Sequence, residues 1–196
     1  MSHRISVITV TLNAGRFLAD CLDSVVAQGD SLFEHIIVDG GSTDSTLEIV
    51  KKYATTDSRI RWISEPDRGI SDAMNKGVAL ATGDIICHLN SDDYYAHPQV
   101  FSTVLNLFAQ KPACLWLTGG FSFVSENGTL IRDFRARRYS FRRLVRGNIL
   151  FHSSTFIKRE LFNSVGGFNL SISLCMDYDL FLRLGSVISP LVVDEL

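Results

Sequence analysis

The chain has 196 residues, of which 46% are hydrophobic and 20% charged, and it carries a formal net charge of −2. A chain of this length buries a sizeable core, so we expect one compact domain over residues 1–196. A net charge this close to zero gives no indication of nucleic acid as a partner, and we expect none.

The cysteines and the apolar runs bear on the cellular compartment. Cys21, Cys87, Cys114 and Cys175 form no C-x-x-C pair, which excludes the usual zinc spacing and favours a reducing, cytoplasmic location. No apolar run is long enough for a signal peptide or a membrane span. The last residues, PLVVDEL, follow an apolar stretch without a polar tail or a helix stop, so we expect the native chain to continue past Leu196.

The first half of the sequence alternates short β-branched runs with longer amphipathic segments. The short runs predict strands over residues 5–10, 36–38, 60–63 and 84–89. Apolar residues at helical spacing predict helices over residues 17–26, from 43 or 44 to about 53, 70–81 and from 98 onward. Gly77 lies on the apolar stripe of the third helix, which predicts close packing against a neighbour. The alternation indicates a three-layer α/β/α fold with a mostly parallel sheet.

The pattern changes near Leu115. The stretch LWLTGGFSFVSENGTLI predicts two strands joined at Asn127-Gly128, a strong signal for an antiparallel hairpin. Two further helices are expected, over about residues 158–164 and 175–184. We therefore divide the single domain into a first half, residues 1–114, and an elaboration, residues 115–196.

Polar residues follow four of the predicted strands. The clusters are Thr11-Leu12-Asn13, Asp39-Gly40-Gly41-Ser42, Ser64-Glu65-Pro66-Asp67 and Asn90-Ser91-Asp92-Asp93. Ligands of open parallel sheets bind beyond the carboxyl ends of the strands, and parallel topology brings these clusters to one edge. The sequence therefore predicts a binding site at that edge.

The segment HLNSDD carries the most specific chemistry of the four. Asp92 and Asp93 leave a hydrophobic strand with no base beside them, and like charges so close disfavour each other unless they share a cation. Carboxylate oxygens suit Mg²⁺ or Mn²⁺, which usually also bind oxygens of a substrate phosphate. The alternative is an Asx turn in which Asp93 begins a loop.

The segment DGGSTDST is rich in glycine and hydroxyl groups but matches neither G-x-x-x-x-G-K-[ST] nor G-x-G-x-x-G. A plain turn with a capping Thr43 or Asp44 accounts for most of it. Asp39 differs, because a carboxylate at the end of a strand is placed to hydrogen-bond a nucleoside.

Taken in order, these segments resemble a known family. SVITVTLNAGRFLADCLDSVVAQ, IIVDGGSTDST, SEPDRGISDAMNKGVALATGD and HLNSDD resemble the inverting glycosyltransferases of family 2, which have the GT-A fold. GNILFHSSTFIKRELFNSVGGFN and MDYDLFLRL resemble the acceptor-side segments of that family. The resemblance covers almost the whole chain. It implies a nucleotide-sugar-binding half, residues 1–114, and an acceptor-side half, residues 115–196.

The resemblance also implies the reaction and its site. We expect a metal-dependent enzyme that moves a sugar from a nucleotide-sugar donor to a saccharide or lipid-linked acceptor, in cell-surface polysaccharide biosynthesis, with Mg²⁺ or Mn²⁺ as cofactor. Asp92 and Asp93 match the D-x-D region and are assigned jointly to the metal. The residues expected to bind the donor are Thr11, Asn13, Asp39, Asp67, Asp72, Asn75, Asn90 and Asp92.

Asp177, in MDYDLFLRL, matches the general base of the family. Inversion requires one carboxylate that deprotonates an acceptor hydroxyl opposite the leaving nucleotide, and no covalent nucleophile. Leu180, Phe181 and Leu184 place Asp177 at or near the start of a helix, where negative charge is favoured.

Two positions depart from the pattern of the family. Relatives often have Asp-Asp-Gly-Ser where this chain has Asp39-Gly40-Gly41-Ser42, which weakens the case for a UDP-linked donor and leaves GDP- and dTDP-sugars open. Relatives often have His-Gln where this chain has His152-Ser153. We place His152 on the acceptor side, with a purely structural histidine as the alternative.

Seven arginines lie between Arg132 and Arg146. They fit a solvated, amphipathic helix and loop, and the functional alternative is contact with an anionic membrane surface, at the inner face of the membrane, or with an acidic acceptor. The alternative to the enzyme as a whole is a catalytically inactive GT-A domain that binds a saccharide or a partner. A dehydrogenase lacks its G-x-G-x-x-G here, and a nucleotidyltransferase lacks its glycine-rich loop after Val10.

Overall fold

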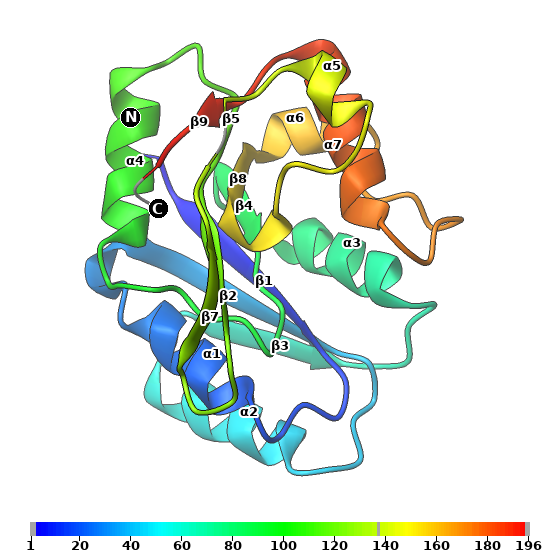
Figure 1. Ribbon diagram of the computed structural model, residues 1–196. Coiled ribbons are helices and arrows are strands. Elements are labelled where there is room, and N and C mark those ends of the chain that lie inside the picture. The colour runs from blue at the N-terminus through cyan, green and yellow to red at the C-terminus, as the bar shows by residue number, and fades with distance from the viewer. Residues whose placement is uncertain (1–2, 137, 195–196) are drawn as a thin grey trace.

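The computed structural model describes residues 3–136 and 138–194, and these form a sheet between two layers of helices (Figure 1). The sheet has seven strands in the order β3-β2-β1-β4-β8-β5-β9. Their bounds are β1 Ile5–Thr11, β2 Leu32–Asp39, β3 Ile60–Ser64, β4 Ile85–His88, β5 Trp116–Thr118, β8 Thr155–Lys158 and β9 Leu191–Val192. This confirms the predicted α/β fold with a mostly parallel sheet.

The direction of the strands separates the two halves of the sheet. β1, β2, β3 and β4 are all parallel, because a helix lies between each of them and the next. β8 runs antiparallel to both of its neighbours, β4 and β5, while β9 pairs parallel with β5. The carboxyl ends of the first four strands therefore share one edge.

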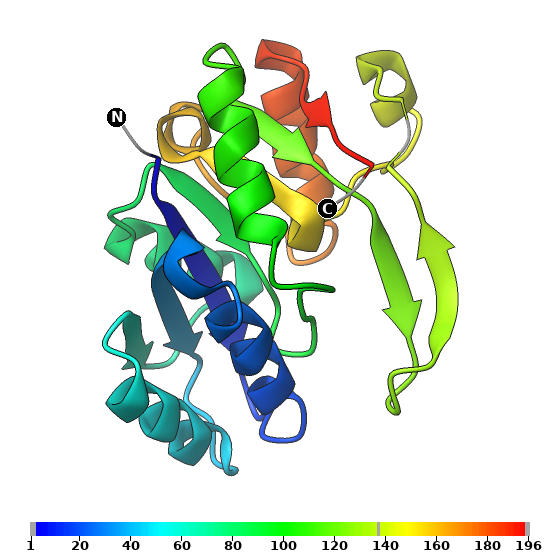
Figure 2. The same ribbon diagram turned by 90° about the vertical axis from the view of Figure 1, so that its left-hand side faces the viewer.

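Helices cover both faces of the sheet, as the two views in Figures 1 and 2 agree. α1, α2 and α4 pack on one face, and α3, α6 and α7 pack on the other. The bounds are α1 Leu18–Val26, α2 Thr46–Thr56, α3 Ile70–Leu80, α4 Val100–Gln110, α5 Phe141–Leu144, α6 Arg159–Ser164, α7 Met176–Val187, and the 3₁₀ turns η1 Gly29–Ser31 and η2 His152–Ser154. Among the described residues, no helix is both long and apolar enough to span a membrane.

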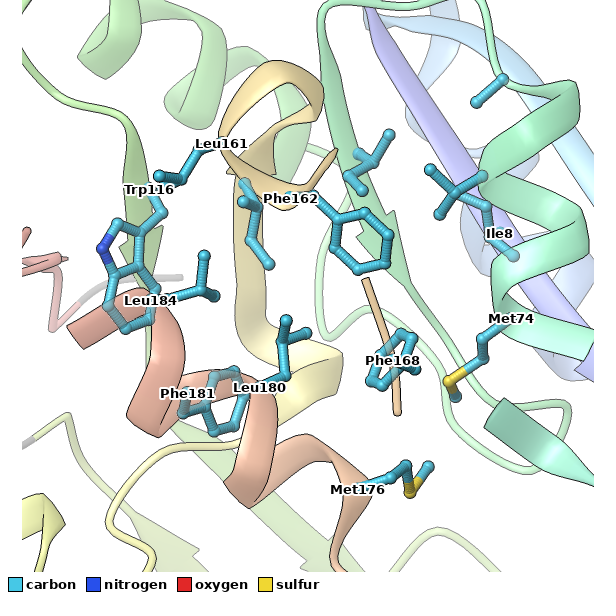
Figure 3. Packing of buried hydrophobic residues seen from close by; sticks show 14 of the residues in the cluster. Ile8, Met74, Trp116, Leu161, Phe162, Phe168, Met176, Leu180, Phe181 and Leu184 are labelled. Carbon is cyan, nitrogen blue, oxygen red and sulfur yellow. The ribbon is translucent and has the colours of Figure 1, made fainter. Parts of the chain in front are cut away.

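The largest core cluster holds the acceptor-side helices against the sheet. Figure 3 shows Trp116 of β5 beside Leu184 and Phe181 of α7, with the rings of Trp116 and Phe181 stacked 6.2 Å apart. On the other side of the cluster, α3 lies directly on β1. A Cβ at Gly77 would lie 2.3 Å from Cγ2 of Ile8, so only glycine fits, as the sequence predicts.

The predicted hairpin at Asn127-Gly128 is confirmed. β6 (Phe121–Val124) and β7 (Leu130–Phe134) form a separate two-stranded sheet, which Figure 2 shows apart from the main sheet. The first predicted strand of this stretch breaks at Gly119-Gly120, so the stretch forms three strands where two were expected. The tip of the hairpin is tied to the loop before α1 by an ion pair between Arg16 and Glu126.

Several boundaries differ from the prediction for physical reasons. β2 begins at Leu32, earlier than expected, because Glu34 and His35 are polar residues that the fold buries with partners. α2 begins at Thr46, because Asp44 instead accepts hydrogen bonds from the backbone N–H and the hydroxyl of Thr46. The strands β8 and β9 were not predicted. Arg137, one of the basic residues singled out in the sequence, lies outside the described residues.

Candidate active site

The carboxyl ends of β1, β2 and β3 place three polar residues side by side. Thr11 pairs with Asp39, and Asp39 pairs with Ser64, in the register of the sheet. Thr11 is buried and its hydroxyl has no hydrogen-bond partner within the described residues, which leaves it available to a ligand. The predicted convergence of the polar clusters at one edge is thus present in the fold.

Asp39 organises the loop that follows β2. Its Oδ2 accepts hydrogen bonds from the N–H groups of Gly41 and Ser42, both at 3.0 Å, and from the hydroxyl of Ser64 at 2.6 Å. The hydroxyl of Ser42 donates to Oδ1. Burial alone would raise the pKa of Asp39, but the hydrogen bonds from Ser42 and Ser64 lower it below the ordinary value. Both oxygens are engaged by the loop, so its contact with a nucleoside stays a prediction.

Asn13 joins the same loop to the end of β1. It has a left-handed backbone (φ 52°), and its Oδ1 accepts a hydrogen bond of 2.9 Å from the N–H of Thr43. Its own N–H donates to the hydroxyl of Ser42 at 2.8 Å. Its side chain is exposed at the edge of the sheet, where the donor is expected.

Gly40, which stands where relatives often have a second acid, faces a carboxylate from another loop. A Cβ at Gly40 would lie only 2.7 Å from Oδ2 of Asp67, whose Oδ1 accepts a 2.7 Å hydrogen bond from the N–H of Gly69. Although position 40 carries no acidic side chain, the carboxylate of Asp67 therefore lies beside the carboxyl end of β2.

Two other predicted donor residues are held in place at α3. Asp72 accepts hydrogen bonds from the backbone and the guanidinium of Arg68, at 3.1 and 3.0 Å, and these hold its pKa below the ordinary value. Asn75 makes two hydrogen bonds with the backbone of Phe168. Its Nδ2 donates to the carbonyl of Phe168 at 2.8 Å, and its Oδ1 accepts from the N–H of Phe168 at 3.0 Å. This geometry gives Asn75 a structural role, and its donor role stays a prediction without geometric support.

The acids after β4 lie in a turn closed by a hydrogen bond from the N–H of Asp93 to the carbonyl of Asn90 at 3.1 Å. Asp92 is exposed and Asp93 is half-buried. Burial raises the pKa of Asp93, the charge of Asp92 adds to this, and His152 opposes it. The Oδ1 of Asn90 is buried and has no hydrogen-bond partner among the described residues. This is a backbone turn and not the Asx turn expected as the alternative, because no side-chain oxygen of Asn90, Asp92 or Asp93 accepts a hydrogen bond within the described residues. Both carboxylates are therefore without hydrogen-bond partners there.

His152 brings the two halves of the site together. Its Nε2 lies 4.0 Å from Oδ2 of Asp93, and its Nδ1 lies 3.8 Å from Oδ2 of Asp177. Asp177 is in the first turn of α7, as predicted. Burial would raise the pKa of Asp177, but the neighbouring imidazole and the backbone N–H groups at the start of the helix lower it. The carboxylate is therefore ionised and able to accept a proton at neutral pH.

One neighbour of Asp177 escaped the sequence analysis. Nδ2 of Asn148 lies 3.4 Å from Oδ2 of Asp177. Asn148 is in a loop whose sequence gives no local signal for this contact.

A cavity of about 1050 Å³ opens beside the same site, between the hairpin and the loop after β4. Its wall includes Asp92 and Asp93 together with Phe121 and Phe134 of the hairpin.

Comparison with known families decides the identity of the fold. The model of the family described as Glycosyl transferase family 2 matches residues 6–166, which include Thr11, Asp39, Asp93 and His152. This chain belongs to glycosyl transferase family 2. Asp177 lies beyond the matched residues.

Curated relatives of this family 2 glycosyltransferase act in glycan synthesis. A PGL/p-HBAD biosynthesis glycosyltransferase of Mycobacterium bovis is 34% identical over 179 residues, 91% of this chain and 68% of the relative. The chondroitin synthase of Escherichia coli is 32% identical over 186 residues, 93% of this chain and 26% of the synthase. The enzyme class predicted from the sequence, a glycosyltransferase, is thereby confirmed.

Solved structures confirm the GT-A fold of this family 2 domain. TarS of S. aureus superposes with a TM-score of 0.77 at 19% identity, over 98% of this chain and 58% of the TarS chain. The mannosyltransferase PcManGT of Pyrobaculum calidifontis, solved with GDP-Man and Mn²⁺, gives a TM-score of 0.73 at 21% identity over 99% of this chain and 57% of its own. The chain thus spans somewhat more than half the length of these structures.

Proposed function

We propose that this family 2 glycosyltransferase transfers a sugar, with inversion, from a nucleotide-sugar donor to a hydroxyl of a saccharide or lipid-linked acceptor. The observation that carries the proposal is the position of His152, whose imidazole lies between Asp93, after β4, and Asp177, in the first turn of α7. An acid proposed to bind the metal and the donor and an acid proposed to activate the acceptor therefore lie on opposite sides of one side chain.

Asp177 is the general base of this reaction. An inverting transfer needs one carboxylate that takes the proton of the attacking hydroxyl, on the face of the sugar opposite the departing nucleotide. Asp177 is suited to this, since its pKa is lowered and its side chain is 20% exposed, enough to meet an acceptor. No covalent intermediate on the enzyme is involved.

The residues after β4 suit a divalent cation. Among residues 3–136 and 138–194, no three His, Cys, Asp or Glu side chains converge closely enough to hold a metal by themselves. Mg²⁺ and Mn²⁺ are often bound by one or two carboxylates together with substrate phosphates, and Asp92 and Asp93 supply the carboxylates. The orphaned Oδ1 of Asn90 beside them fits an additional polar partner. When bound, such an ion neutralises the negative charge of the leaving diphosphate.

Structures of related proteins with bound nucleotide-sugars support this donor chemistry. TarS has been solved with UDP-GlcNAc and PcManGT with GDP-Man and Mn²⁺, so both uridine and guanosine donors occur on this fold. The relatives that build glycans support a saccharide or lipid-linked acceptor in cell-surface polysaccharide synthesis for this chain as well.

Calorimetry with UDP, GDP and dTDP, each with and without Mn²⁺, tests the metal and donor roles. We expect Mn²⁺ to raise the affinity for at least one nucleotide in the parent, and Asp92→Ala and Asp93→Ala to remove that gain. Asp84→Ala is the matched control, because Asp84 is an exposed acid at the opposite end of the same strand. Parental binding by both site variants would refute the metal assignment. Nucleotide binding without sugar transfer to any acceptor would instead indicate an inactive binding module.

The basic segment is proposed to hold the enzyme at the anionic cytoplasmic surface of a membrane. Arg142, Arg143 and Arg146 are all exposed in and around α5, and the apolar side chains of Phe141 and Val145 are exposed among them. Cations interleaved with apolar groups suit a lipid headgroup region, where each basic residue contributes about 1 kcal/mol. This surface would bring the enzyme to a lipid-linked acceptor.

A further inference from the structure

The two ring nitrogens of His152 face two different carboxylates, and neither contact is a hydrogen bond. Nδ1 lies 3.8 Å from Oδ2 of Asp177 and Nε2 lies 4.0 Å from Oδ2 of Asp93. Nε2 is also buried and has no hydrogen-bond partner among the described residues. A buried polar nitrogen without a partner is costly, so this atom is suited to a ligand that the chain itself does not supply.

The tautomer that metal binding at Nε2 requires is compatible with the neighbours of His152. A neutral imidazole has one N–H donor and one lone pair, and a nitrogen that binds a metal ion uses its lone pair, so the proton is on the other nitrogen. With the proton on Nδ1, directed at Asp177, the lone pair of Nε2 faces the carboxylate of Asp93. Two acceptors that face each other in a partly buried site repel, and a cation between them removes the repulsion.

The geometry points to His152 as a nitrogen ligand of the divalent cation, sharing the ion with Asp93 and leaving the remaining ligands to the donor diphosphate and water. This inference rests on the proposed function, which supplies the ion. It adds a ligand from the acceptor-side half of the chain to a site that the sequence places entirely after β4.

The separation of the two atoms fits a shared ion. The Nε2–Oδ2 distance of 4.0 Å is longer than a hydrogen bond and leaves room for one ion that both atoms would bind at about 2.1 Å. Metal-bound histidines almost always donate their second N–H to a carboxylate, a backbone carbonyl or a water, which orients the ring. Here the carboxylate that faces Nδ1, at 3.8 Å, is Asp177, the proposed base, so the ring would connect the metal to the residue that accepts the acceptor proton.

Electron spin echo spectroscopy of bound Mn²⁺ tests this inference without measuring activity. A coordinated imidazole gives the Mn²⁺ signal a ¹⁴N modulation, which changes to a ¹⁵N pattern when only histidine is labelled with ¹⁵N. We expect this modulation in the parent, with UDP or GDP added to complete the site. The labelling experiment needs no variant, so it does not depend on whether an altered protein folds.

Variants assign the modulation to one residue. His152→Gln should abolish it and weaken Mn²⁺ binding by about tenfold or more, while the metal-free protein unfolds at nearly the parental temperature. His3→Gln is the matched control, because His3 packs against Phe108 at the opposite end of β1. Asp177→Asn keeps the ligand but alters its orienting partner, so it should weaken Mn²⁺ binding and retain the modulation.

The possible outcomes separate this inference from the proposed function. Mn²⁺ that binds the parent through Asp92 and Asp93 but shows no histidine nitrogen would overturn the inference and leave the proposed function intact. A modulation that survives in His152→Gln would also overturn it. The absence of any Mn²⁺ binding, with either nucleotide, would overturn both the inference and the metal-dependent function.

Discussion

Asp67 holds its carboxylate in the space that a side chain at position 40 would need, with Oδ2 only 2.7 Å from the Cβ position of Gly40. If Asp67 contacts the base of the donor, it accepts a hydrogen bond from a ring N–H. Uracil, thymine and guanine each present such an N–H, whereas N3 of cytosine is itself an acceptor. Sites built for a hydrogen bond reject analogues that lack it.

We therefore predict that the enzyme binds more than uridine nucleotides. Thermal shift in Mn²⁺ should show stabilisation by GDP or dTDP in addition to UDP, and little by CDP, since a ligand that binds only the folded state raises its stability. Asp67→Asn should relax the discrimination against CDP. A profile restricted to uridine would contradict the prediction.

Replacing Asp177 by asparagine should separate catalysis from folding. Asp177 is the second residue of α7, whose N-cap is Cys175, so asparagine removes only a favourable charge near the helix N-terminus, about 0.3–1 kcal/mol. Asparagine does not act as a carboxylate base, so turnover should fall by about 10²–10⁴-fold while the donor still binds at saturating Mn²⁺. Asp179→Asn, in which the lost carboxylate is paired with Arg183 at 2.7 Å, is the control. Transfer rates near those of the parent in Asp177→Asn would move the base to another residue.

The pH dependence of turnover follows from the same carboxylate. The pKa of Asp177 lies below its ordinary value, so the base stays ionised as the pH falls towards that of an ordinary aspartate. Turnover should be lost only when the pH falls through the lowered pKa. A rate profile that declines on the acid side near neutrality would argue against Asp177 as the base.

Asn75→Ala should cost stability and leave the donor site unchanged. The variant leaves the N–H and the carbonyl of Phe168 without their partners, which costs about 1–3 kcal/mol for buried polar groups. Urea unfolding measures the loss, and Asn163→Ala, on the exposed surface of α6, is the control. If the variant kept the parental stability but bound nucleotide more weakly, Asn75 would be assigned to binding of the nucleotide-sugar donor, as the sequence predicts.

Gly77→Ala should destabilise the fold although alanine is the better helix former. The gain of about 1 kcal/mol in helix propensity is opposed by overpacking against Ile8, which typically costs about 1–3 kcal/mol. In an Ile8→Ala background the same change should cost less, because the methyl group that it meets is gone. Equal effects of Gly77→Ala in both backgrounds, measured by urea unfolding, would refute the contact.

Removing charge from the basic segment should weaken binding to anionic vesicles. Replacing Arg138, Arg142, Arg143 and Arg146 by glutamine should lower co-sedimentation with phosphatidylserine vesicles and reduce its dependence on salt. The control replaces four other exposed basic residues, Arg4, Lys51, Lys52 and Lys111. Equal sedimentation of the two variants and the parent would leave the arginines as a solvated surface.

Much of the fold could be predicted because its signals are local. The apolar periods predict α1 and α3 to within a residue or two, the Asn127-Gly128 pair predicts the hairpin, and Gly77 predicts the close approach of α3 to β1. The alternation of strands and helices also predicts that the polar clusters meet at one edge, since parallel strands end on the same side of a sheet.

The start of β2 and the position of β8 needed the tertiary structure. Glu34 is buried because Ser6 donates to it at 2.7 Å and the N–H of Thr82 donates at 2.6 Å, and both donors are remote in the sequence. His35 is buried beside the hydroxyl of Thr9 at 2.8 Å. Polar residues within a strand hide its apolar period, and their partners become visible only when the chain is folded.

The sequence by itself determined the family, the layers of the fold and the acids of the site, because these depend on residue types and on spacing along the chain. The tertiary structure alone decided how those acids are used. It turned Asn75 towards Phe168, engaged both oxygens of Asp39 within a loop, and set His152 between Asp93 and Asp177. The contacts of Asn75 and His152 depend on distances of a few ångströms between segments up to 93 residues apart, and no local pattern encodes them.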